Sequence, residues 1–151
     1  MCSSDLFFSS CREDAARLLN AKPDEIALVG PTSNALSLIA NGLPLRKRDN
    51  IVIYHDDYPS NVYPWMALAE KGVRVRFLNI REFGRIREID VLGQLDEETR
   101  LVALASCHFV SGFRIDLASI GKALRARGVL FCVDGIQTLG AFPTTVEHVD
   151  F

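Results

Sequence analysis

Short apolar segments that end in polar residues recur along the chain. Four of them show no alternation: Glu25–Val29, Asn50–Tyr54, Thr99–Ala105 and Gly128–Val133. Uninterrupted apolar runs are typical of strands that are buried on both faces of a parallel sheet. In Val73–Leu78 arginine alternates with apolar residues, which predicts a half-exposed, edge-like strand.

Amphipathic stretches between these segments predict helices. Glycines at 42, 72 and 128 follow three of the stretches and are typical helix stops. Strands that alternate with helices indicate an α/β fold, a mostly parallel sheet with flanking helices. The expected helices are 11–20, 35–42 after a polar start at 32–34, about 64–71, 89–95 with Asp90 as its cap, and 117–127 with Asp116 as its cap.

Composition narrows the class of protein. The 151 residues are 48% hydrophobic with a formal net charge of −2, which suits one domain with a substantial core. No apolar run is long enough to span a bilayer. The basic clusters Arg46–Arg48 and Arg81–Arg87 are short and mixed with acids, so we expect neither a membrane nor nucleic acid as a partner.

The cysteines Cys2, Cys11, Cys107 and Cys132 have no CxxC spacing and no histidine pattern typical of a metal site. We therefore expect no metal and free thiols in the cytoplasm, a reducing compartment. Cys107 and Cys132 lie in strand-like runs, where a small buried hydrophobe is the expected role. No secretory signal is evident at the N-terminus.

The first six residues, Met1–Leu6, are what a common sequencing-adapter end encodes in this frame when GTG is the start codon. We expect residues 1–6 to be an assembly artefact and residues 7–151 to be part of a longer reading frame.

The strand at Gly128–Val133 ends in a carboxylate, Asp134, followed by Gly135 and the amide of Gln137. The carboxyl end of such a strand opens into the crevice where α/β sheets bind ligands. A buried charge there is costly without a cationic partner. The alternative is that Asp134 only caps the following turn.

Polar or aromatic groups follow other predicted strands as well. Thr32, Ser33 and Asn34 begin a helix whose N–H groups could bind an anion, although one of the hydroxyls could merely cap that helix. Tyr58 and His108 lie in loops after two further strands. The carboxyl ends of parallel strands share one rim of a sheet, so these groups are expected to converge. Walker and GxGxxG motifs are absent.

A ligand that carries a phosphate, a flat ring and a ring cation would use the whole set. The phosphate would bind at the start of the helix, and Tyr58 would stack on the ring. Asp134 would pair with a protonated ring nitrogen, and Gln137 would hydrogen-bond a ring substituent. Pyridoxal 5'-phosphate has this chemistry.

The chain resembles the class V aminotransferase family of pyridoxal-phosphate-dependent enzymes, which includes cysteine desulfurases, selenocysteine lyases and isopenicillin N epimerase-like proteins. The resemblance runs from about Asn20 to Phe151. It rests on four segments in order: Ile26–Ala35, Tyr58–Trp65, Ser111–Leu117 and Val133–Gln137. It implies part of the large domain of a fold-type I enzyme.

The resemblance also implies roles for individual residues. Thr32 and Ser33 would contact the phosphate with the Asn34 amide near by. Asp134 would pair with the pyridine nitrogen, and Gln137 would approach the ring hydroxyl. His108 could supply polarity beside the ring; a structural histidine is the alternative.

Two positions depart from the family pattern. Tyr58 stands where many relatives place a stacking histidine, which keeps a flat face but removes a titratable group. Phe109 stands where desulfurases tend to have an asparagine near the ring hydroxyl. Phe109 therefore favours an epimerase-like or uncharacterised member over a typical desulfurase.

One departure concerns the lysine that forms a Schiff base with the cofactor. In the family it lies in a Gly/Ser-His-Lys segment beyond the Asp-x-x-Gln strand, and this sequence stops just before it, at Phe151. None of the lysines fits that motif: Lys22, Lys47, Lys71 and Lys122.

The intact parent is therefore expected to be an enzyme, a homodimer that acts at the α-carbon of an amino acid by desulfuration, transamination or epimerisation. These residues alone are expected to be inactive. The alternative is a non-catalytic α/β domain that binds a phosphorylated small molecule or a protein partner. A flavodoxin-like nucleotide binder is disfavoured by the missing glycine motifs.

Overall fold

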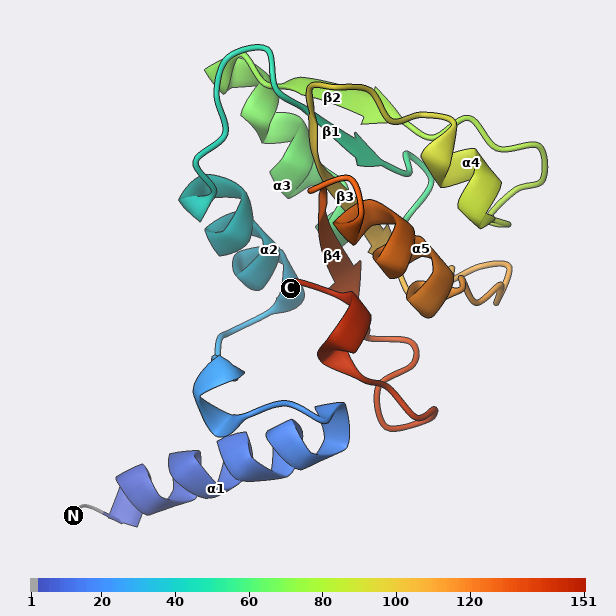
Figure 1. The fold of residues 1–151 in the computed structure, drawn as a ribbon. Helices are drawn as coiled ribbons and strands as arrows, with labels where there is room; N and C mark the ends of the chain where they lie inside the picture. The colour runs from blue at the N-terminus through green and yellow to red at the C-terminus, as the bar shows by residue number, and fades with distance from the viewer. Residues whose placement is uncertain (1–2) are drawn as a thin grey trace.

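The computed structural model describes residues 3–151 and contains a four-stranded parallel sheet in the order β2-β1-β3-β4 (Figure 1). Met1 and Cys2, which belong to the expected artefact, lie outside the described residues. The α/β class and the parallel sheet are confirmed. The strands are β1 Asn50–Ile53, β2 Arg74–Phe77, β3 Thr99–Ala105 and β4 Leu130–Asp134.

Helices cover both faces of the sheet because each central strand presents apolar side chains to both sides (Figure 1). Ile51 and Ile53 pack against helices on one face, and Val52 packs against helices on the other. The first face is covered by α2 Thr32–Gly42, α3 Tyr63–Met66 and the 3-10 helix η3 Ala67–Lys71. The second is covered by α4 Glu88–Leu92 and α5 Leu117–Arg125.

The N-terminal helix α1, Ser3–Leu19, lies apart from the sheet and packs against the short 3-10 helix η1, Pro23–Glu25 (Figure 1). Arg12 Nε donates to the carbonyl of Ile26 at 3.2 Å, which joins α1 to the chain leading into α2. Two further 3-10 helices, η2 Pro59–Asn61 and η4 Val146–His148, lie in loops at the carboxyl side of the sheet.

The strand expected at residues 25–29 does not form. Ile26 has an extended backbone, but residues 26–29 pair with no strand of the described chain, and Leu28 and Val29 are exposed. The apolar pattern therefore predicted a strand at a place where the chain forms none. Without a neighbouring strand, such a segment has no sheet hydrogen bonds to make.

Two helix details also differ from expectation. Asp90 is not the N-cap of α4; Arg87 is, and Asp90 is the third helical residue, whose carboxylate accepts the Arg87 N–H at 3.0 Å. This contact still gives the Arg87 N–H, at the start of the helix, a hydrogen-bond acceptor. Asp116 caps α5 as predicted and accepts the Ser119 N–H at 3.0 Å.

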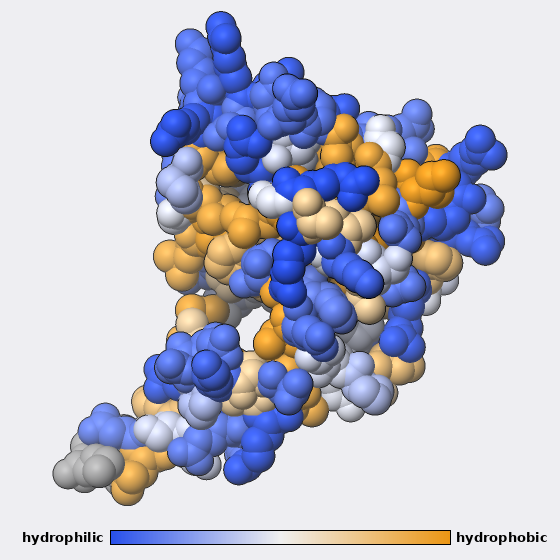
Figure 2. Space-filling view, in the orientation of Figure 1, coloured by the Kyte–Doolittle hydropathy of each residue, from blue (hydrophilic) through white to orange (hydrophobic). Residues whose placement is uncertain are grey.

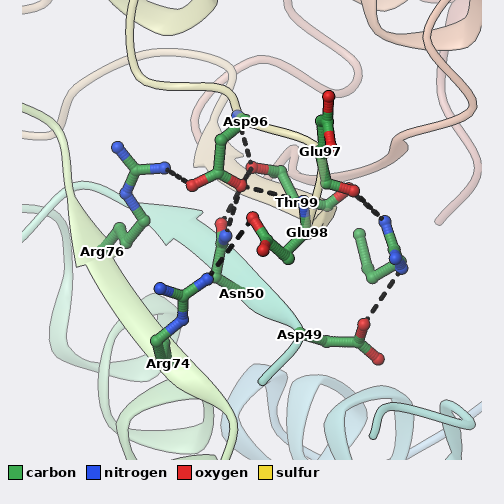
Figure 3. A network of polar contacts seen from close by, with 9 residues as sticks. Asp49, Asn50, Arg74, Arg76, Asp96, Glu97, Glu98 and Thr99 are labelled. Carbon is green, nitrogen blue, oxygen red and sulfur yellow. Dashed lines mark hydrogen bonds and ion pairs between the residues drawn. The ribbon is translucent and has the colours of Figure 1, made fainter. Parts of the chain in front are cut away.

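A polar network joins the amino-terminal ends of the strands β1 and β3 (Figure 3). Asn50 Nδ2 donates to Asp96 at 2.6 Å, and the Thr99 hydroxyl donates to Asn50 Oδ1 at 2.9 Å. Arg76 lies 2.5 Å from the other Asp96 oxygen. The buried side chains of Asn50 and Thr99 thus find hydrogen-bond partners within the network, as buried polar groups usually do.

Apolar side chains also reach the surface, notably over α2 and the segment that leads into it (Figure 2). Leu28, Val29 and Leu38 are exposed there. Within residues 3–151, none of the helices combines the length and the hydropathy that crossing a membrane requires.

Candidate functional site

A cavity of about 360 Å³ lies where the carboxyl ends of the strands meet the start of α2. It brings together four of the predicted site residues, Thr32, Tyr58, Asp134 and Gln137. They come from three separate segments of the chain: the start of α2, the loop after β1, and the end of β4 with its following turn, as expected for one rim of a parallel sheet. The full lining is Pro31, Thr32, Tyr58, Ser60, Asp134, Ile136 and Gln137.

Asp134 is the buried carboxylate of this cavity, with 5% of the residue exposed. Its Oδ1 accepts the N–H of Ile136 at 3.0 Å, so the turn-capping interpretation holds for one oxygen. No ion pair within residues 3–151 includes Asp134. A buried carboxylate without a cationic partner is costly, and the cavity it lines can admit a cation.

Ser106, the residue directly after β3, holds Asp134 in place. The carbonyl oxygen of Asp134 accepts the Ser106 N–H at 2.9 Å and the Ser106 hydroxyl at 3.0 Å. Ser106 Oγ also lies 2.7 Å from Thr138 Oγ1, in the turn after β4. Both hydroxyl residues are buried, so the turn between β4 and Gln137 is fixed by the neighbouring strand.

The start of α2 supplies the second wall. Its N-cap is Pro31, whose carbonyl accepts the N–H groups of Asn34 and Ala35 at 2.8 and 3.2 Å. No side chain caps this helix, so neither Thr32 nor Ser33 fills the capping role that was the alternative. The first N–H groups of a helix have no intrahelical acceptor and attract anions.

The predicted phosphate-binding residues do not all reach the cavity. Thr32 lines it, while Ser33 and Asn34 are exposed in the same first turn and lie outside the lining. Residues one and two positions along a helix point in different directions, which explains the difference.

Tyr58 forms the third wall, with 48% of the residue exposed. Its ring meets the ring of Phe109 edge to face, with centroids 5.4 Å apart. Its backbone N–H donates to Asp57 Oδ1 at 2.7 Å. The exposed ring face is therefore presented by a loop that is itself fixed.

His108 is not part of the cavity lining and is 3% exposed. Its Nε2 lies 3.0 Å from the Asp56 carbonyl, which can only accept, so Nε2 is the donor. Its Nδ1 accepts the Ser111 N–H at 3.2 Å. A Cβ on Gly84 would lie 2.1 Å from Nδ1, so the ring is tightly enclosed. With both nitrogens engaged inside the protein, His108 has the contacts of a structural histidine.

Sequence reasoning missed two buried polar residues beside the cavity, Asp57 and Asn61. Asp57 Oδ2 accepts the Ala105 N–H at 2.9 Å and Asn61 Nδ2 at 3.0 Å. Asn61 Oδ1 in turn accepts Trp65 Nε1 at 3.3 Å. The i, i+4, i+8 spacing of these three residues was the available signal, because it places them on one side of consecutive turns.

Burial raises the pKa of Asp57 above its ordinary value, hydrogen bonds from Tyr58, Ala105 and Asn61 oppose the rise, and the nearby Asp134 carboxylate adds to it. Two acidic side chains therefore lie close together at this rim of the sheet.

Every lysine lies away from the cavity. The side chains of Lys22, Lys47, Lys71 and Lys122 are exposed, and none lines the cavity. Lys71 Nζ, for example, donates to Asn41 Oδ1 at 2.7 Å on the outer surface of the α2 layer. The described chain therefore offers no amino group for a covalent bond to a ligand in this cavity.

Residues 5–151 match the family profile described as aminotransferase class V. Because the match extends over nearly the whole chain, this protein belongs to the class V aminotransferase family.

Curated relatives include the "Probable cysteine desulfurase" of Methanothermobacter thermautotrophicus, which is 34% identical over 91% of this chain and 34% of its own length. The cysteine desulfurase of Pectobacterium carotovorum is 33% identical over 92% of this chain and 35% of its own length. The chain thus spans about a third of the length of these relatives.

Solved structures share the fold. The cysteine desulfurase CsdA of Escherichia coli has a TM-score of 0.84 and 27% identity over 95% of this chain and 38% of its own. The cystine C-S lyase C-DES, solved with its product cysteine persulfide, has a TM-score of 0.87 at 22% identity over 97% of this chain and 40% of its own. A variant of C-DES carries glycine covalently linked to its PLP cofactor.

Proposed function

We propose that this chain carries the cofactor-binding rim of a pyridoxal-phosphate-dependent enzyme that acts at the α-carbon of an amino acid. The single observation that carries the proposal is Asp134, a buried carboxylate that lines the cavity without an ion-pair partner in the described chain. A protonated pyridine nitrogen would supply the missing positive charge.

The residues of the cavity fit the chemical groups of pyridoxal phosphate. The uncapped start of α2, with Thr32 in the cavity wall, offers donors to a phosphate. The exposed ring of Tyr58 offers a flat apolar face. The Gln137 side chain is exposed in the same cavity and can hydrogen-bond a ring substituent.

When bound, the cofactor supplies an electron-withdrawing pyridine ring that stabilises negative charge at the substrate α-carbon. Asp134 would hold the proton on the ring nitrogen, which keeps the ring electron-withdrawing. Tyr58 would orient the ring and exclude water from one face, and the α2 N-terminus would anchor the phosphate. Ser33 and Asn34 remain proposed phosphate ligands from the same turn, and His108 a proposed residue near the ring.

Among the possible reactions, the relatives favour desulfuration. The curated relatives named above are cysteine desulfurases, so a sulfur-containing amino acid such as cysteine is the substrate we propose. Phe109, in contact with Tyr58, still predicts a ring environment different from that of a typical desulfurase. The cytoplasm as compartment is supported by the free thiols of Cys11, Cys107 and Cys132.

We further propose that the covalent lysine belongs to a part of the parent enzyme other than these 151 residues, and that the parent is a homodimer. The exposed positions of all lysines support the first point, and the family resemblance supports the second. On this proposal the chain binds the cofactor reversibly and does not turn substrate over.

The test is a titration of the 151-residue chain with pyridoxamine 5'-phosphate, which cannot form Schiff bases with surface lysines. We expect saturable binding followed by ligand fluorescence, with competition from pyridoxal phosphate. No saturable binding by the folded chain would count against the cofactor.

In the reading frame around this sequence, we expect a Gly/Ser-His-Lys segment that borohydride reduction labels with pyridoxal phosphate.

A non-catalytic domain that binds a phosphorylated small molecule is the second candidate. The absence of any lysine at the cavity favours it. Inorganic phosphate or a sugar phosphate that binds as tightly as pyridoxamine phosphate would support this candidate, because the ring contacts with Tyr58 and Asp134 would then contribute nothing.

A further inference from the structure

Asp57 is a buried carboxylate beside the cavity to which the proposed function gives no role. It is 6% exposed and lies one residue before Tyr58, but it does not line the cavity. Three N–H groups donate to its two oxygens: Tyr58 N at 2.7 Å, Ala105 N at 2.9 Å and Asn61 Nδ2 at 3.0 Å. Hydrogen bonds to an ionised group are stronger than neutral ones, so this side chain is firmly held.

These bonds join the loop that carries Tyr58 to β3, the strand that pairs with the Asp134 strand β4. Ala105 ends β3 and pairs in register with Asp134 of β4. The next residue, Ser106, donates its N–H and its hydroxyl to the Asp134 carbonyl. Asp57 therefore connects the loop that presents Tyr58 to the end of β4 that presents Asp134. The connection runs through the adjacent residues Ala105 and Ser106.

We propose that Asp57 is a positioning residue that fixes the ring of Tyr58 relative to the Asp134 carboxylate. A flat ligand ring can then lie against Tyr58 while its nitrogen meets Asp134. The inference rests on the proposed function, because the ligand it invokes is the pyridine ring.

A carboxylate suits this role better than the amide of asparagine. Three donors converge on Asp57, and an asparagine would turn an N–H toward at least one of them. Burial next to Asp134 raises the pKa of Asp57, so the carboxylate is kept at this position against an electrostatic cost. A residue that only filled space would not need to be acidic.

The experiment compares the full chain with the variant Asp57→Asn, using pyridoxamine 5'-phosphate as the probe. Two quantities are measured at a temperature where both proteins are folded: the Kd, and the induced circular dichroism per bound ligand, which reports how rigidly the ring is oriented. We expect Asp57→Asn to raise the Kd roughly tenfold and to weaken the induced signal.

Gly121→Ala is the matched control, because it strains α5, which packs on the face of the sheet that α2 does not cover. It should lower the thermal stability and leave both binding quantities unchanged, which separates positioning from a general loss of stability. An Asp57→Asn variant with the Kd and induced signal of the wild type would overturn the positioning role alone. A wild-type chain that does not bind the probe would instead overturn the proposed function.

If Asp57→Asn does not fold, Asp57→Glu serves in its place. It keeps the charge and both acceptor oxygens but moves the carboxylate by one methylene, so the Tyr58 loop must shift. A weaker induced signal would support the proposal, and a signal equal to that of the wild type would contradict it.

Discussion

The hydroxyl of Ser106 donates to the carbonyl oxygen of Asp134 at 3.0 Å, alongside the Ser106 N–H at 2.9 Å. Asp134, which has the proposed ligand contact, is thus held by both the backbone and the side chain of Ser106, directly after the neighbouring strand β3. Ser106 is also 2.7 Å from the Thr138 hydroxyl, so both sides of the turn after β4 depend on it.

Ser106→Ala should therefore destabilise the protein by about 1–2 kcal/mol. The variant loses the buried hydrogen bond to the Asp134 carbonyl. The Thr138 hydroxyl also loses its contact with Ser106 and keeps only the longer 3.4 Å contact to the Gly135 carbonyl. Urea unfolding followed by circular dichroism measures the change. Ser37→Ala is the control, since its hydroxyl donates only to the Ser33 carbonyl on the exposed side of α2. Equal losses for the two variants would argue against a special role for Ser106.

Asp134→Asn should weaken binding of pyridoxamine phosphate roughly tenfold or more, because a hydrogen bond to a charged group contributes about 1.5–3 kcal/mol. The fold should persist, since the asparagine oxygen can still accept the Ile136 N–H. Fluorescence titration gives the two Kd values. Asp56→Asn changes a nearby carboxylate that is exposed and outside the cavity, and it should bind like the wild type. Unchanged affinity for Asp134→Asn would remove the main support for the cofactor.

Much of the fold follows from local patterns. The segments at 50–54, 99–105 and 128–133 contain the strands β1, β3 and β4. Uninterrupted apolar runs of this kind are stable only where both faces of the strand are covered. Residues 25–29 carry the same pattern but form no ladder, because a strand also requires a partner at the right place. Periodicity reports burial, and it carries no information about which strands are neighbours.

The same limit applies to the site. Thr32, Tyr58, Asp134 and Gln137 converge because the rule for parallel strand ends is geometric and holds for any such sheet. The bond between Asp57 and the Ala105 N–H spans 48 residues of sequence and depends on the packing of one loop against β3. The spacing of Asp57, Asn61 and Trp65 suggests that the three residues share one side, but it does not show that Asp57 accepts the Ala105 N–H.

Gly121→Ala should destabilise the protein although alanine favours helices. A Cβ at this position would lie 1.9 Å from the carbonyl oxygen of His148, so η4 would have to move. Overpacking of this kind costs about 1–3 kcal/mol, against a helix-propensity gain of about 1 kcal/mol. Gly42 is the last residue of α2, and no atom lies within 4 Å of a Cβ added there. Gly42→Ala should therefore cause no loss of stability. Thermal unfolding compares the two, and a Gly121→Ala protein as stable as Gly42→Ala would contradict the packing.

Stability should fall in acid because of two carboxyl groups. The hydrogen bond from the Asn50 side chain lowers the pKa of Asp96, and the hydrogen bond from the Arg87 side chain lowers the pKa of Asp90. Their stabilisation is fully present above the unfolded-state pKa of about 3.9 and is lost as pH falls through the lower folded-state pKa. Burial raises the pKa of Asp57, so its own contribution changes in the opposite direction, disappearing as pH rises.

Asp96→Asn tests the acid dependence, since it removes the titrating group from the network in Figure 3. The variant should be less stable than the wild type at neutral pH, and the difference should shrink below about pH 4. Urea unfolding across this range measures it. Glu97→Gln is the control, because only the backbone carbonyl of Glu97 takes part, through Arg100 at 2.8 Å. A constant difference between Asp96→Asn and the wild type at every pH would contradict the assignment.

Cys132 should be inert although it lies two residues before Asp134. Burial raises the pKa of its thiol to about 12, and the Asp134 charge adds to the rise. The thiolate is the reactive form, so iodoacetamide at neutral pH should alkylate Cys132 only after unfolding. Cys11 and Cys107 are half-buried and should react in the folded protein. Mass spectrometry of the digested protein distinguishes the sites.

Alkylation of Cys132 in the folded chain as fast as in urea would contradict both its burial and its raised pKa. The expected inertness also bears on the proposed chemistry. A cysteine that accepts sulfur must be a nucleophile, and a nucleophilic thiol needs a depressed pKa and access to solvent. Cys132 has neither, so a desulfurase built on this chain would need a different cysteine for sulfur transfer.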